Sequence, residues 1–191
     1  MGLFNRNDDD NLKKKQSKLR EDFLTACQKG TAAEVEKYIA AGADVNVVGS
    51  MGSTPLYYAV LNGNLEVTKT LIKNGANVNA RVHGVNGAFN DNMGTTVLLI
   101  AVQRDFTEIA QLLISNKAYV HVQDGSGLTA LHYAAKRGNN NVARRLLNKG
   151  ADATVKDKWG HAPDYYARAN GYPDLARILR HRAAPPPPPA A

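Results

Sequence analysis

The stretch TALHYAAKRG, residues 129–138, contains a pattern that returns along the chain at a fixed spacing. Its alanine, Ala134, is followed four residues later by a glycine, Gly138. The same pair occurs three more times, as Ala26 and Gly30, Ala59 and Gly63, and Ala167 and Gly171. Successive pairs are 33, 75 and 33 residues apart, and 75 is two periods of 33 plus nine. An internal repeat of this length predicts a solenoid, in which each repeat packs on the next.

The missing copy lies between the second and the fourth. Residues 96–101, TVLLIA, align with residues 54–59, TPLYYA, at a spacing nine residues longer than the period. We therefore expect an insertion at about Val82 to Asn92, where two glycines and three asparagines favour tight turns. It would form a finger that extends the hairpin between repeats two and three, with contacts through His83, Val85 and Phe89. Tolerated surface drift is the alternative.

Other short runs recur with the same period. They are TPLY at 54–57, TALH at 129–132, GADVN at 42–46, GANVN at 75–79 and GAD at 150–152. These runs resemble the ankyrin repeat family over about residues 19–182. The resemblance implies an all-α ankyrin-repeat solenoid of about five helix-turn-helix repeats with projecting β-turn or hairpin loops. It says little about function, because ankyrin arrays bind very different partners with one scaffold.

The helix boundaries follow from capping chemistry. A threonine hydroxyl can accept a hydrogen bond from the first turn of a helix, so we expect first helices to begin after Thr54, Thr96 and Thr129. Glycines in the left-handed conformation are expected to end the first helices. They are Gly30, Gly63, Gly138 and Gly171. In the third repeat Asp105 replaces the glycine that ends the first helix, and Lys117 replaces the glycine expected to end the second helix, so either the turn geometry differs or this repeat is locally weak.

The chain divides into three segments. We expect a polar, basic lead-in at residues 1–18, the repeat domain at 19–182 and a disordered, proline-rich tail at 183–191. The lead-in is expected to be helical and to shield the first repeat, with contact to nucleic acid or an anionic surface as the alternative. In the last repeat Asp164 replaces a core leucine, which fits a terminal cap that faces water.

Positive charge is concentrated in the last two repeats. The net charge is +7, and residues 136–182 hold eleven Lys or Arg against four Asp, so the rest of the chain sums to zero. Lys136 and Arg137 lie near the end of a first helix, which in the resembled family faces the concave groove. This charge favours a partner with an acidic surface. Nucleic acid is a weaker expectation, because no base-reading motif accompanies the charge.

Two columns of equivalent positions are expected on that groove. The residues before the repeated alanines are Thr25, Tyr58, Ile100, Tyr133 and Tyr166. Tyrosine supplies contact area with little rotamer entropy, so it is common in binding surfaces, although these rings could also only pack against neighbouring repeats. At the turn tips, Met93 and Trp159 stand where polar residues are usual, which favours a role in contacting a partner.

Catalysis finds little support. The five histidines share no metal-ligand spacing, Cys27 has no second thiol, and no phosphate loop or nucleophile elbow is present. We expect no enzyme activity, no metal site and no cofactor; the resemblance gives His132 a structural hydrogen bond. The opening residues lack a signal-like apolar core and the longest uncharged apolar run is six residues, so we expect a cytoplasmic protein with no membrane span. Secretion without such a signal stays open.

These observations predict a non-catalytic, monomeric scaffold that recognises another protein through the groove and the finger. The expected contact residues are Tyr58, Phe89, Met93, Ile100, Arg104, Tyr133, Lys136, Arg137, Trp159 and Tyr166. One alternative is that the basic C-terminal repeats bind nucleic acid or another acidic polymer. A second is that Asn46 and Asn79 are modified, because they resemble the asparagines that are hydroxylated in this family.

Overall fold

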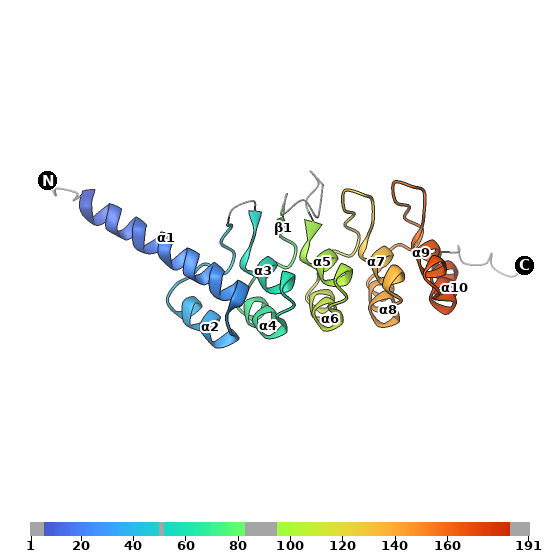
Figure 1. Cartoon of the computed structure of the whole chain (residues 1–191), viewed down its shortest axis with the longest axis horizontal. Helices are drawn as coiled ribbons and strands as arrows, with labels where there is room; N and C mark the ends of the chain where they lie inside the picture. The colour runs from blue at the N-terminus through green and yellow to red at the C-terminus, as the bar shows by residue number, and fades with distance from the viewer. Residues whose placement is uncertain (1–5, 50–51, 83–94, 184–191) are drawn as a thin grey trace, which may run out of the picture. The chain divides into compact units, whose positions relative to one another are not determined.

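The computed structural model describes residues 6–49, 52–82 and 95–183. The chain divides into two compact units, residues 1–77 and 78–191, and each is described by itself below. Both units consist mainly of paired helices, which are labelled in Figure 1. The helical repeat architecture predicted from the 33-residue period is therefore confirmed.

The described residues of the first unit form four helices. They are α1 (Arg6–Lys29), α2 (Ala32–Ala40), α3 (Pro55–Leu61) and α4 (Leu65–Lys73). Helix α1 packs against α2 and α3, and α2 packs against α4. Because α1 runs unbroken through residue 18, the described part of the lead-in, residues 6–18, and the first helix of the first repeat form one helix.

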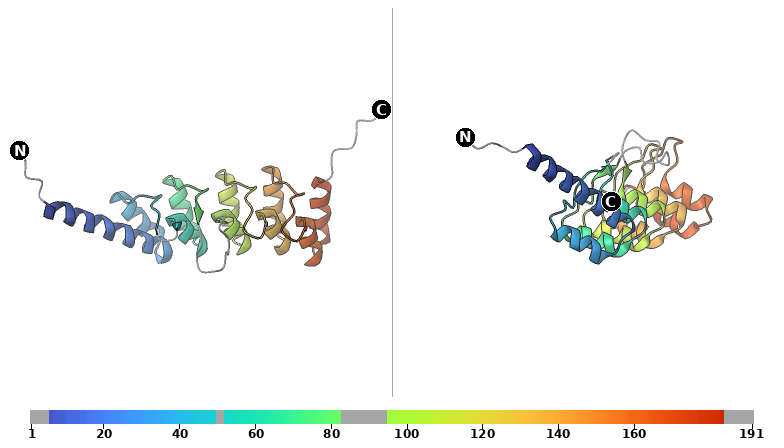
Figure 2. Two further views of the ribbon diagram at one scale, coloured as in Figure 1. Left: turned by 90° about the horizontal axis from the view of Figure 1, so that it is seen from above. Right: turned by 60° about the vertical axis from the view of Figure 1, so that its left-hand side comes forward.

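The second unit contains three helical hairpins and a short pair of strands. Its elements are β1 (Arg81–Val82), β2 (Thr95–Thr96), α5 (Val97–Gln103), α6 (Thr107–Ser115), α7 (Ala130–Arg137), α8 (Asn140–Asn148), α9 (Pro163–Ala169) and α10 (Pro173–Ala183). The first helices α5, α7 and α9 lie side by side, and α6 lies beside α8, as Figures 1 and 2 show. The strands pair antiparallel, with Arg81 opposite Thr96 and Val82 opposite Thr95. The chain segments that flank the predicted insertion are thereby paired.

Small side chains allow this close stacking. In the second unit Ala101, Ala134 and Ala167 are completely buried, each in the middle of a first helix. The second helices contribute leucines that are also fully buried, such as Leu113 and Leu146. A single hairpin could not cover these residues, so neighbouring hairpins complete one another's core.

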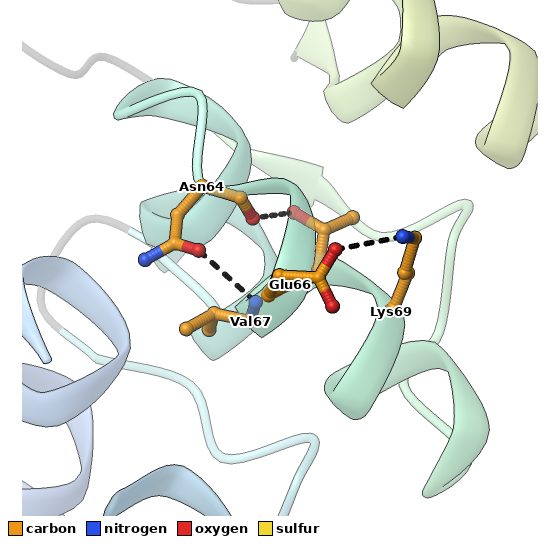
Figure 3. Close-up of polar contacts among 5 residues, drawn as sticks. Asn64, Glu66, Val67 and Lys69 are labelled. Carbon is orange, nitrogen blue, oxygen red and sulfur yellow. Dashed lines mark hydrogen bonds and ion pairs between the residues drawn. The ribbon is translucent and has the colours of Figure 1, made fainter. Parts of the chain in front are cut away.

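Polar caps fix the helix starts in the first unit. The Thr54 hydroxyl accepts a hydrogen bond from the Tyr57 N–H at 3.1 Å, as expected. Asn64 caps α4 in the same way by accepting from the Val67 N–H at 3.1 Å (Figure 3). Its side-chain amide also donates to the Gly30 carbonyl at 3.2 Å. One asparagine therefore begins a helix and ties it to the preceding hairpin.

Two expectations about helix boundaries, one at a start and one at an end, require correction. The Thr96 hydroxyl makes no capping bond and has no hydrogen-bond partner among the described residues, although Thr96 occupies the N-cap position of α5. Gly63, Gly138 and Gly171 have positive φ as expected, but Gly30 does not. A Cβ at Gly30 would lie 2.6 Å from the Ala26 carbonyl oxygen, so this position requires glycine for lack of space.

The two glycine replacements in the third repeat keep the left-handed conformation. Asp105 has φ of 60° and Lys117 has φ of 66°. The turn geometry of the repeat is therefore preserved at the expense of backbone strain, since an L-residue there costs roughly 1–2 kcal/mol.

Replacing Lys117 with glycine should relieve this strain and raise the free energy of unfolding by about 1 kcal/mol. Urea denaturation followed by circular dichroism measures the change. The matched control is Lys149→Gly at the end of α8, where φ is −93° and glycine should lower stability by about 0.5–1 kcal/mol. Equal losses in both variants would show that position 117 is not strained.

Candidate protein-binding surface

Two turns of the second unit share one construction. The 124 turn, residues 124–129, precedes α7, and the 157 turn, residues 157–162, precedes α9; both project beyond the helices on the same side (Figure 1). Each is organised by an aspartate that is more than nine-tenths buried. Asp124 Oδ1 accepts from the N–H groups of Ser126 and Leu128 at 2.8 and 3.0 Å. The Tyr133 hydroxyl donates to its Oδ2 at 2.5 Å.

Asp157 repeats this arrangement 33 residues later. Its Oδ1 accepts from the N–H groups of Trp159 and His161, both at 2.9 Å, and the Tyr166 hydroxyl donates to Oδ2 at 2.5 Å. Three donors thus satisfy the buried carboxylate, which fixes the backbone of the turn. We call this combination of a buried aspartate with two backbone N–H groups and a tyrosine hydroxyl the carboxylate clamp.

In the clamp of the 157 turn, the pKa values of both ionisable groups are shifted. Burial acts to raise the pKa of the Asp157 carboxyl, but the bonds from Tyr166, His161 and Trp159 outweigh it, so this pKa lies below its usual value. Burial and the hydrogen bond to Asp157 raise the pKa of Tyr166 to about 12. Both shifts favour the pair of an ionised carboxylate and a neutral phenol.

His132 connects the two turns. Its side chain is 1% exposed, Nδ1 accepts from the Thr129 N–H at 3.0 Å, and Nε2 donates to the His161 carbonyl at 3.2 Å. This pattern needs the neutral ring with its proton on Nε2, and burial lowers the pKa accordingly. The structural hydrogen bond expected for His132 is thus present.

The residues that precede the repeated alanines were expected to contact a partner, but they have a different role. Tyr133 and Tyr166 are half-buried and use their hydroxyls in the clamps. Ile100 is completely buried in α5, as are all of residues 95–102, so it offers no surface to a partner, contrary to expectation. In the first unit, the Tyr58 hydroxyl lies 3.0 Å from Ser53 Oγ. The rings thus help to build the turns.

Trp159 is the large apolar side chain that remains exposed on the 157 turn. It is 63% exposed, although Asp157 holds its own N–H, and the neighbouring Lys158 N–H donates to the Ser126 carbonyl at 3.0 Å. Beside it in α9, Tyr165 is 40% exposed and stacks on His161 with ring centres 3.7 Å apart. The sequence interpretation missed Tyr165, which occupies the position of His132 one repeat later.

The expected charge donors lie at the ends of first helices. Lys136 and Arg104 are exposed, and neither pairs with a carboxylate of the described chain. Arg137 instead donates from Nε and Nη2 to the Gln103 carbonyl, at 3.2 and 2.8 Å. Arg137 therefore ties α7 to α5, while Lys136 and Arg104 are available to a partner.

The other predicted contact residues, Phe89 and Met93, lie outside the described residues, as does most of the predicted finger. The clamp itself was missed, yet a signal for it exists. An aspartate followed nine residues later by tyrosine occurs twice at the repeat spacing, as Asp124 with Tyr133 and Asp157 with Tyr166.

Catalytic and metal-binding features are not found in the described part of the chain. No group of three His, Cys, Asp or Glu residues there could hold a metal ion. Cys27 is buried, and burial raises its pKa to about 12, which disfavours a thiolate nucleophile. The described helices also include none that is both long and apolar enough to cross a membrane.

The raised pKa of Tyr166 gives a direct test of the clamp. The neutral phenol stabilises the fold below the ordinary pKa of tyrosine, about 10, and this contribution is lost as the pH rises towards 12. Titration followed by near-ultraviolet absorbance should show a late tyrosine step whose amplitude Tyr166→Phe lowers by one tyrosine. Tyr165→Phe, the adjacent control, should leave the late step unchanged. A late step of unchanged amplitude in Tyr166→Phe would contradict the clamp at Asp157.

Comparison with known proteins finds partial relatives. A 46-residue segment is 50% identical to alpha-latrotoxin-Lh1a of Latrodectus hasselti, covering 24% of this chain and 3% of the toxin. Protein phosphatase 1 regulatory subunit 27 of Mus musculus is 35% identical over 94 residues, which are 49% of this chain and 55% of that protein. E3 ubiquitin-protein ligase KEG of Arabidopsis thaliana is 32% identical over 118 residues, 48% of this chain and 7% of the ligase. The chain thus spans at most about half the length of these relatives.

The repeat region matches a family as a whole. The family described as ankyrin repeats in three copies matches residues 23–124 and, in a second overlapping match, residues 98–186. Together these matches cover residues 23–186, which include the end of α1 and all of the helices from α2 to α10. The chain therefore belongs to the ankyrin repeat family.

Proposed function

We propose that this chain is a non-catalytic protein-binding scaffold. Its second unit would contact the acidic surface of a partner protein through the 157 turn and the exposed ends of the first helices. The residues proposed to make contact are Trp159 and Tyr165 together with Arg104 and Lys136. Phe89 and Met93 stay in the proposal as sequence-based candidates, and Tyr133, Tyr166 and Arg137 become residues that position the surface.

The observation that carries this proposal is an exposed tryptophan on an immobilised turn. The Trp159 side chain is 63% exposed, while its backbone is held by Asp157 and by the bond from Lys158 to Ser126. Exposing an indole has a hydrophobic cost, and nothing in the fold of the turn needs one there. A rigid aromatic group loses little entropy on binding, which makes it an effective contact for a partner.

Charge supports an acidic partner. Lys156 and Lys158 flank the clamp aspartate, are exposed and pair with no carboxylate of the described chain. Asp157 itself is buried and fully hydrogen-bonded, so it does not offset their charge at the surface. Complementary charge would speed association and favour acidic partners over basic ones.

The relatives support the same class of function. The mouse protein is named a regulatory subunit, and a subunit that regulates an enzyme must bind another protein. Ankyrin arrays in general bind partners and do not catalyse reactions. By analogy, we propose a binding role here; the mouse protein does not identify the partner.

Binding of an acidic polymer is the second candidate. Arg144 and Arg145 on α8 are exposed, as are Arg177 and Arg182 on α10. Such a surface could bind nucleic acid, with affinity that falls steeply as salt increases. The described residues supply no base-reading motif, so protein binding remains our first proposal.

Affinity capture from nuclease-treated and untreated lysate tests the proposal. The double variant Trp159→Ala/Lys136→Glu should capture about tenfold less, or still less, of a protein that the wild type retains, because exposed tryptophans often dominate binding energy. The matched control is Arg145→Glu, which places the same charge change on α8. Tyr133 and Tyr166 should be left intact, since their loss would loosen the turns.

Circular dichroism must first show that each variant is folded. Equal capture by the wild type and the double variant would contradict the proposed surface. Loss of capture after nuclease treatment, or in Arg145→Glu alone, would instead favour the acidic polymer.

A further inference from the structure

The 157 turn covers one edge of the 124 turn. The Lys158 N–H donates to the Ser126 carbonyl at 3.0 Å. A Cβ placed on Gly127 would lie 3.1 Å from Asp157 Cα and 3.2 Å from the Lys158 nitrogen. The later turn thus supplies a hydrogen-bond donor and close backbone packing to the earlier one.

The corresponding edge of the 157 turn is open. Trp159 and Gly160 stand 33 residues after Ser126 and Gly127. The Trp159 carbonyl accepts no hydrogen bond from the described residues, and a Cβ on Gly160 would meet nothing within 4 Å. The edge therefore presents an unpaired acceptor, an open backbone surface and a 63% exposed indole together.

The helices next to the 157 turn, α9 and α10, carry charged side chains instead. Asp164 in α9 lies 3.7 Å from Arg168 and 3.5 Å from Arg180, and both arginine side chains are exposed. The terminal cap expected from Asp164 stays a prediction. The helical layer is thus suited to water, whereas the turn beside it keeps an aromatic side chain and an unpaired carbonyl.

We propose that this open edge, formed by Trp159 and Gly160 and flanked by Lys156 and Lys158, docks an extended acidic segment of a partner protein. A backbone N–H of the segment donates to the Trp159 carbonyl, as Lys158 donates to Ser126 one turn earlier. The indole packs against the segment's side chains, and the two lysines pair with its carboxylates. This inference rests on the proposed protein-binding function and specifies its partner.

The chemistry of the edge selects this occupant. An unpaired carbonyl needs a donor, and an extended strand presents free N–H groups, whereas a helix uses nearly all of its own internally. The chain's own Pro185–Pro189 run has no N–H to offer. The two unpaired lysines favour carboxylates near the docked segment.

Fluorescence provides the test, because Trp159 is the single tryptophan of the chain. The probe is a short capped peptide that alternates acidic and β-branched residues. Two further peptides have the same sequence with N-methyl groups on alternate amides, one peptide for each register. N-methylation removes the backbone N–H donors and keeps the charge. The intact peptide should shift Trp159 emission saturably, and the N-methylated peptide of the correct register should bind about fivefold or more weakly.

Matched variants locate the site. Lys156→Glu/Lys158→Glu should weaken binding of the intact peptide about tenfold, whereas Arg144→Glu/Arg145→Glu on α8, with the same change of charge, should leave it within about twofold. Equal binding of the intact and both N-methylated peptides would overturn the backbone contact. Equal weakening by the two double variants would overturn the location at the edge.

Other occupants give their own results. If a single-stranded oligonucleotide competes with the peptide and binds more tightly, the acidic-segment proposal fails in favour of a polymer. If sedimentation of the chain alone shows a dimer that Trp159→Ala dissociates, the occupant is a second copy. If the edge fails these tests while capture still depends on Trp159 and Lys136, the scaffold function stands and this inference alone is rejected.

Discussion

The buried carboxylate of the clamp is the interaction on which the candidate surface depends. Taking an aspartate out of water is costly unless its charge is satisfied, and Asp157 meets this condition with two N–H groups and a phenol. The bonds join the tip of the turn to the middle of α9, so the turn cannot move independently of its helix. Asp124 does the same for α7. Because each clamp bonds a turn to its own helix, the projecting turns repeat at the same spacing as the helices.

Helix spacing in turn depends on side-chain size. Ala101, Ala134 and Ala167 allow the first helices to approach, and at that separation His132 reaches the carbonyl of His161 in the next turn. The neutral imidazole suits this buried position because it donates on one side and accepts on the other. Larger residues at the alanines would therefore disturb both the core and the alignment of neighbouring turns.

The sequence was sufficient for the period and the helices, because these follow from local chemistry repeated at one spacing. It left the turn geometry at Asp105 and Lys117 open, and the structure shows both in the left-handed conformation. The sequence was insufficient for Ile100, Gly30 and Thr96. Equivalent positions in a column share a backbone but not an environment, so Ile100 is buried while Tyr133 is half-exposed. We predicted that the tyrosines bind a partner because helical periodicity does not reveal what their hydroxyls bond to. The acceptors are aspartates on the turns, nine residues earlier in the chain.

Ser126 and Trp159 show how this scaffold separates stability from recognition. Both follow a clamp aspartate by two residues, and both donate their N–H to it at nearly the same distance. The backbone conformation is therefore set by the aspartate and the tyrosine, while the side chain at the tip is left without a structural role. Any residue compatible with the turn can occupy that position at little cost to folding. An exposed tryptophan there, where serine serves the fold equally well, is best explained by a contact outside the chain.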